Sequence, residues 1–184
     1  MNTRARDEWS WHAVVRHLFW VSVFLLGLAA LLAAQTNNWK RYENKDGHFA
    51  VLFPGEPVDK ELSWEGVRKH YLTAIEKPAV YVVIYGNQET PQPVDNPTYE
   101  GYRDGVFDNL PGCQVGPEKP APAREGYIGH WYRLDCDFDD LRVVIEGNLY
   151  WGTHHSYAVL VMLPPDTDEP KSSKTFWESF SPNE

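Results

Sequence analysis

The sequence predicts an α+β domain, an antiparallel β-sheet flanked by helices. Three segments with strand-like alternation precede one helical segment, and three longer strand-like segments and a second helical segment follow. Compact turns join the late strands, which favours antiparallel hairpins. Helices that bury an apolar face on such a sheet would satisfy the hydrophobic pattern.

Composition limits the classes of partner. The chain has 184 residues, of which 42% are hydrophobic and 14% aromatic, enough for one well-packed domain. Its formal charge is -9 and its pI is about 5.2. An acidic chain is repelled by phosphates, so we expect no nucleic-acid partner and no binding to anionic lipid surfaces.

Residues 1–34 differ from the rest. Basic Arg4, Arg6 and Arg16 precede Leu18–Ala34, a run with no residue more polar than Ser22. At 1.5 Å per residue this run spans about 25 Å as a helix. The pattern is typical of a signal peptide or of an uncleaved N-terminal membrane anchor. Both alternatives place residues 35–184, expected to be a single domain, in an extracytoplasmic compartment (periplasmic, lumenal or secreted). Membrane contact is expected only through an uncleaved segment.

The first three strands are expected at His48–Phe53, Val67–Glu76 and Ala79–Gly86. The first ends at a corner that contains Pro54 and Pro57, which lack the N–H that a paired strand donates. The third is apolar at nearly every position, as in an interior strand covered on both faces.

The first helix is expected after a polar loop. Asn96 is a suitable N-cap, and Pro97 suits the first helical position. One apolar stripe recurs at three- and four-residue steps: Tyr99, Tyr102, Val106 and Leu110. The glycine- and proline-rich segment that follows is expected to be a surface loop.

The last strands are expected at Tyr127–Phe138, Leu141–Trp151 and His155–Leu163. Alternation in the first of them predicts that Tyr132, Leu134, Cys136 and Phe138 face one way, and Trp131, Arg133, Asp135 and Asp137 the other. A short terminal helix capped by Asp168 is expected to bury Phe176, Trp177 and Phe180.

Four carboxylates crowd one predicted hairpin end: Asp135, Asp137, Asp139 and Asp140. Hard cations such as Ca²⁺ and Mn²⁺ prefer such oxygen-rich ligands. The neighbouring Arg133 could instead neutralise the charge of Asp135. Aspartates at a hairpin end also discourage pairing with another strand at the sheet edge. A Ca²⁺ or Mn²⁺ site and a solvated hairpin are both compatible with the pattern, and the sequence indicates no other cofactor.

The two cysteines, Cys113 and Cys136, have two interpretations. In an oxidising compartment they would form a disulfide that closes a loop of about 23 residues. Two buried thiols are the alternative, because sequence spacing does not give the distance between the Cα atoms.

Trp131 and Arg133 are the candidate partner-binding residues, since Trp and Arg often dominate binding energy. A tryptophan covered by a helix is the alternative interpretation. His154 and His155 suggest zinc, but neighbours on a strand point to opposite faces and would not chelate one ion. No serine-hydrolase motif or glycine-rich phosphate loop occurs in the sequence, so no enzymatic activity is expected.

Four stretches resemble the PsbP-like domain family: "W..YE..DGHFAVLFPGEPV" from Trp39, "VYVVIYG", "RVVIEGNLYWGTHHSYAVLVM" and "FWESF". The family includes the extrinsic lumenal subunit of photosystem II and small exported bacterial proteins. The resemblance covers Trp39 to Phe180 and implies an α/β/α sandwich. It also implies a non-enzymatic domain that binds or stabilises a protein assembly at the cell envelope. A divalent-cation-binding protein is the alternative function.

Overall fold

Strands dominate the part of the chain that the computed structural model describes, which is residues 39–64, 67–138 and 141–183. Of these residues 54% lie in strands and 16% in two helices. The strands form two antiparallel sheets. The predicted class, α+β with helices flanking one sheet in an α/β/α sandwich, is therefore wrong, and the domain is mainly β.

The larger sheet has eight strands and carries most of the domain. Its order is β3-β4-β5-β10-β9-β8-β6, and β7 also pairs with β8. The bounds are β3 Val58–Trp64, β4 Val67–Glu76, β5 Ala79–Asn87, β6 Cys113–Val115, β7 Lys119–Pro120, β8 Ile128–Phe138, β9 Leu141–Trp151 and β10 His155–Leu163. The prediction of β5 and β10 as interior strands is confirmed, because each has a hydrogen-bonded neighbour on both sides.

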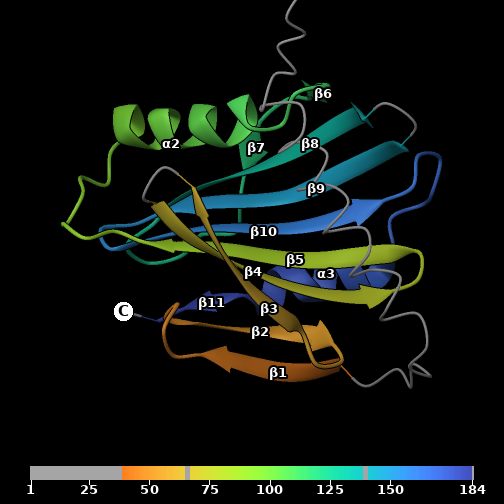
Figure 1. Ribbon diagram of the computed structural model, residues 1–184, viewed down its shortest axis with the longest axis horizontal. Coiled ribbons are helices and arrows are strands. Elements are labelled where there is room, and N and C mark those ends of the chain that lie inside the picture. The colour runs from red at the N-terminus through yellow and green to blue at the C-terminus, as the bar shows by residue number, and fades with distance from the viewer. Residues whose placement is uncertain (1–38, 65–66, 139–140, 184) are drawn as a thin grey trace, which may run out of the picture. The chain divides into compact units, whose positions relative to one another are not determined.

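The smaller sheet was not predicted. It consists of β1 (Trp39–Asn44), β2 (Phe49–Pro54) and β11 (Ser181–Pro182), in the order β1-β2-β11. The strand expected at His48–Phe53 exists as β2, but it pairs with β1 and β11 and not with the larger sheet. Figure 1 shows β8, β9, β10 and β5 of the larger sheet lying between this small sheet and helix α2 (Asn96–Asp108).

Different elements cover the two faces of the larger sheet, which is why the sandwich prediction fails. Helix α2 packs on the face that carries Tyr132, Leu134 and Cys136. The opposite face packs against β2 and helix α3 (Lys171–Ser179). A second sheet thus supplies much of the cover that a helical layer was expected to provide.

The core between the two sheets is aromatic. Phe49, Val51 and Phe53 of β2 are fully buried and point to the larger sheet. Phe49 has ring contacts with Tyr85 of β5 and Tyr157 of β10, with centroids 5.5 and 5.7 Å apart. Edge contacts between aromatic rings add to the free energy of simple burial. This cluster fixes the smaller sheet on the larger one.

Both predicted helix caps are corrected. The N-cap of α2 is Asp95, whose Oδ1 accepts from the backbone N–H of Thr98 at 2.9 Å, so Asn96 already lies in the helix. The N-cap of α3 is Pro170, without a side-chain capping bond, so Asp168 does not cap it. The expected burial of Phe176, Trp177 and Phe180 is confirmed.

The two cysteines form a disulfide at the edge of the larger sheet. Cys113 of β6 lies directly opposite Cys136 of β8 in the antiparallel register, and their sulfurs are bonded. Cys136 is buried and its neighbours Asp135 and Asp137 are exposed, in agreement with the predicted alternation. The disulfide ties the three-residue strand β6 to the core of the sheet.

The predicted export segment, residues 1–34, lies outside the described residues, as does the turn at Asp139 and Asp140. The described residues belong to one compact unit, Asn37–Glu184. Within that described part, neither helix has the length and apolar character that a membrane crossing needs.

Candidate functional site

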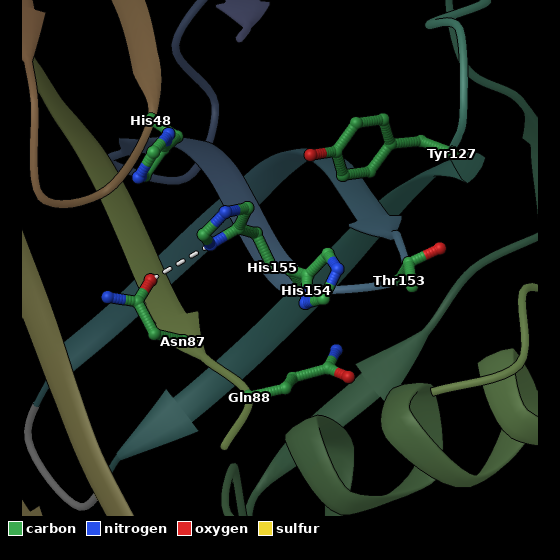
Figure 2. A pocket seen from close by; sticks show the side chains of 7 residues that line it. All are labelled: His48, Asn87, Gln88, Tyr127, Thr153, His154 and His155. Carbon is green, nitrogen blue, oxygen red and sulfur yellow. Dashed lines mark hydrogen bonds between the residues drawn. The ribbon is translucent and has the colours of Figure 1, made fainter. Parts of the chain in front are cut away.

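An open hollow of about 630 Å³ lies at one end of the two sheets (Figure 2). It is built from the β1–β2 turn, the end of β5, the β9–β10 turn and the residue before β8. Its lining is polar and aromatic: His48, Asn87, Gln88, Tyr127, Thr153, His154 and His155. Turns held by a rigid scaffold are the usual place for binding residues.

Two adjacent histidines line the same hollow because only one of them belongs to a strand. Strand β9 ends at Trp151 and β10 begins at His155, so His154 lies in the bend between them. The expectation that His154 and His155 face opposite ways assumed a continuous strand and is wrong (Figure 2). The bend needs Gly152, because a Cβ at that position would overlap the ring of Tyr127.

His48 comes from the smaller sheet and was not recognised from the sequence. It has the left-handed φ of 51°, which is rare for residues other than glycine. Its carbonyl accepts from the backbone N–H of Asn183 at 2.6 Å and from the hydroxyl of Tyr157 at 3.2 Å. Its ring stacks on that of His155, with centroids 4.7 Å apart and planes at 23°. The hollow therefore bridges the two sheets.

The orientation of Asn87 fixes the tautomer of His155. The Asn87 Nδ2 donates to the carbonyl of Asp46 at 3.1 Å. Its Oδ1 therefore faces the Nδ1 of His155, 3.0 Å away. An amide oxygen only accepts, so His155 must carry a proton on Nδ1 and donate it. Neutral His155 then has its lone pair on Nε2.

The surroundings keep His155 uncharged at neutral pH. Burial lowers the pKa of His155, and the neighbouring His48 and His154 lower it further. The ring centroids of His154 and His155 are 6.3 Å apart. A charged imidazole here would lose hydration and would be repelled by any second charge, so the neutral form is favoured.

This lowered pKa predicts a loss of stability in acid. The unfolded chain binds a proton at His155 near pH 6.5, whereas the folded chain binds it only at lower pH. The folded state therefore has its full free energy of unfolding above pH 6.5. Part of that free energy is lost as the pH falls through the pKa of His155 in the folded chain. We expect the free energy of unfolding, measured in urea, to fall between pH 7.5 and pH 5.5. This fall should be smaller for His155→Gln than for the unchanged protein.

The matched control is His130→Gln, a histidine substitution outside the hollow. It should not reduce the difference in unfolding free energy between the two pH values. An unaltered difference in His155→Gln would contradict the assignment of this acid sensitivity to the hollow.

The predicted cation ligands stay a hypothesis. Asp135 and Asp137 lie exposed on β8, and Asp139 and Asp140 are outside the described residues. The Asp135 Oδ1 lies 3.4 Å from Nη2 of Arg133. Within residues 39–64, 67–138 and 141–183, no group of three or more His, Cys, Asp or Glu is placed to hold a metal ion.

The predicted partner-binding pair lies away from the hollow. Trp131 is half-buried, and the Lys119 ammonium lies over its ring, 4.4 Å from the ring centroid. Arg133 Nη1 binds Glu146 Oε1 at 2.7 Å. The carboxylate of Glu146 is almost fully buried. Both candidates thus have contacts within the domain, and their role in partner binding stays a prediction.

A second cluster of titratable residues joins α2 to β8. The hydroxyls of Tyr99 and Tyr132 are 3.0 Å apart. Glu118 pairs with His130 and, at 3.5 Å, with Arg103. Burial is the main cause that raises the pKa of Tyr99 strongly and that of Tyr132 to about 12. These groups pair with one another, which supports a role in holding α2 on the sheet.

No family model, no curated protein and no solved structure matches the chain. The PsbP-like resemblance therefore stays a prediction from the quoted motifs.

Proposed function

We propose that the chain is a non-enzymatic extracytoplasmic domain that binds a protein or protein assembly at the cell envelope, and that the hollow is its docking point. The observation that carries this proposal is the convergence of four segments from both sheets on one open, polar and aromatic hollow. Its volume, about 630 Å³, lies in the range of known ligand sites.

The chemistry of the lining favours binding over bond cleavage. The hollow presents imidazoles, amides, a threonine hydroxyl and a tyrosine, groups that donate and accept hydrogen bonds or stack on a ligand. A nucleophilic threonine needs a base within hydrogen-bonding distance. Among the described residues, the hydrogen bond of His155 Nδ1 goes to Asn87 and not to Thr153. A docking role is the simpler use of these groups.

Two features support an extracytoplasmic location of the domain and a rigid site. Disulfides such as Cys113–Cys136 persist in oxidising compartments, which an exported domain enters. Hydrogen bonds hold the backbone of the turns that line the hollow. Gln88 donates its backbone N–H to the His154 carbonyl at 2.9 Å, and the Tyr157 hydroxyl donates to the Gly47 carbonyl at 2.8 Å. A prearranged hollow loses less conformational entropy on binding.

Site-specific photo-crosslinking in the producing cells tests the proposal. A benzophenone amino acid at Thr153 should yield a discrete adduct with one envelope protein. The matched control carries the same group at Val115, which is 47% exposed and lies on β6, and it should yield none. A third position, Arg133, tests the partner-binding surface expected from the sequence. Adducts only at position 133, equal adducts at 153 and 115, or no adduct at 153 would each overturn docking at the hollow.

A further inference from the structure

The hollow gathers basic side chains in a chain with a formal charge of -9. Three of its seven lining residues are histidines, and none of the seven is a carboxylate. His48 lies on the β1–β2 turn, His154 lies just before β10, and His155 is the first residue of β10. A hollow lined by imidazoles and free of carboxylates suits an anionic group of a ligand.

The hydrogen bonds of His155 decide when it can bind an anion. Its Nδ1–H is already donated to Asn87, so Nε2 is the ring atom left for a ligand. In the neutral ring Nε2 is an acceptor, which an anion avoids. Only a second proton turns Nε2 into a charged donor. His48 and His154, by contrast, donate to a ligand as neutral rings in the appropriate tautomer.

We propose that the hollow binds a carboxylate of the docking partner, and that binding takes up one proton at His155. This proposal rests on the docking function above and adds the chemistry of the bound group. A bound carboxylate would compensate the positive charge of protonated His155 and accept from the new donor at Nε2. Acidification would therefore strengthen docking, by about tenfold for each pH unit above the folded pKa of His155.

The other groups around His155 fit this assignment. On the β1–β2 turn, Lys45 and Asp46 are exposed and outside the lining, and Asp46 meets Asn87 through its carbonyl. On β10, Tyr157 donates its hydroxyl to the Gly47 and His48 carbonyls. Tyr127 lines the hollow on the side of β8, and Glu89, next to Gln88, is exposed and not part of the lining. His155 is thus the group whose protonation the carboxylate requires.

The test follows the histidine ring signals of the full-length chain by NMR in a neutral detergent. The probes are acetate, inorganic phosphate, a short peptide with one central glutamate and the same peptide with glutamine. At pH 5.5 the glutamate peptide should shift the signals of the hollow's histidines and raise the measured pKa of His155. Its affinity should be about tenfold lower at each higher pH unit. The glutamine peptide should leave these signals unchanged.

Two variants separate the outcomes. His155→Gln should remove the pH dependence of peptide binding, and His130→Gln, outside the hollow, should retain it. Binding that is independent of pH, or equal for the two peptides, would overturn the proposal. If acetate and phosphate bind as well as the glutamate peptide, the claim that the bound carboxylate belongs to a protein partner would be wrong. A crosslinked partner at position 153, together with unmoved histidine signals, would disprove only the carboxylate and leave the docking function standing.

Discussion

The variant Phe49→Ala should lower the free energy of unfolding by about 3–5 kcal/mol, the usual cost of removing a fully buried phenylalanine. Phe49 has 0% exposure and stands between the two sheets. Its ring lies 5.5 Å from that of Tyr85 and 5.7 Å from that of Phe180. The large effect is expected because the neighbouring rings belong to elements that cannot collapse into the cavity together. Urea unfolding followed by tryptophan fluorescence measures the change.

Two further variants make this prediction specific. Phe49→Leu keeps most of the volume and should cost less than Phe49→Ala. Val115→Ala, at a side chain that is 47% exposed, should change the unfolding free energy by no more than about 0.5 kcal/mol. A cost below 1 kcal/mol for Phe49→Ala would mean that the aromatic contacts between the sheets do not stabilise the fold as described.

Replacing both cysteines by serine should lower the free energy of unfolding by about 3 kcal/mol, from the entropy of an open loop in the unfolded chain. The two residues are 23 positions apart in the sequence. For a domain of this size the change corresponds to a fall in melting temperature of about 6–12 °C. Strand β6 has three residues, so its pairing with β8 depends strongly on the covalent link.

Reduction of the unchanged protein is the matched control for the double serine variant. The two should melt at nearly the same temperature, since both lack the crosslink and neither alters another contact of β6. Equal melting temperatures for the oxidised protein and the serine variant would contradict a stabilising disulfide. A much lower value for the serine variant than for the reduced protein would point to the buried serine at position 136 as the main cost.

Local patterns located most of the long strands. Strand β4 has the predicted bounds, Val67–Glu76, and β9 and β10 likewise match, because half-buried or fully buried interior strands leave a strong apolar signal. The sequence missed the short strand β11 and the short strands β6 and β7, which lie in the segment expected to be a surface loop. It also missed two longer strands, β1 ("WKRYEN") and β3 ("VDKELSW"). Both lie at sheet edges, where a strand has one paired neighbour and tolerates polar residues on both faces. Such a strand has little periodicity to detect.

The start of a helix is also hard to predict from the sequence to the exact residue. Asp95 and Asn96 are adjacent and both are good caps, and the preference of proline for the first helical position favoured Asn96. The observed bond from Thr98 to Asp95 shifts the start by one residue. At the candidate site, the sequence singled out His154 and His155 but treated both as strand residues, although the expected strand begins at His155. His48 and Asn87 gave no signal, because each reaches the hollow through pairing with distant residues.

Local patterns were enough to predict the main strands, the two helical segments, the alternation along β8 and the acidic charge, since these depend on residues a few positions apart. They could not predict that β2 joins a second sheet, because its partner β11 lies about 130 residues further along the chain, at Ser181 and Pro182. The packing of the smaller sheet on the larger one brings His48 against His155. Hydrogen bonding between strands has no local sequence code, so the fold class and the hollow appear only when the chain is folded.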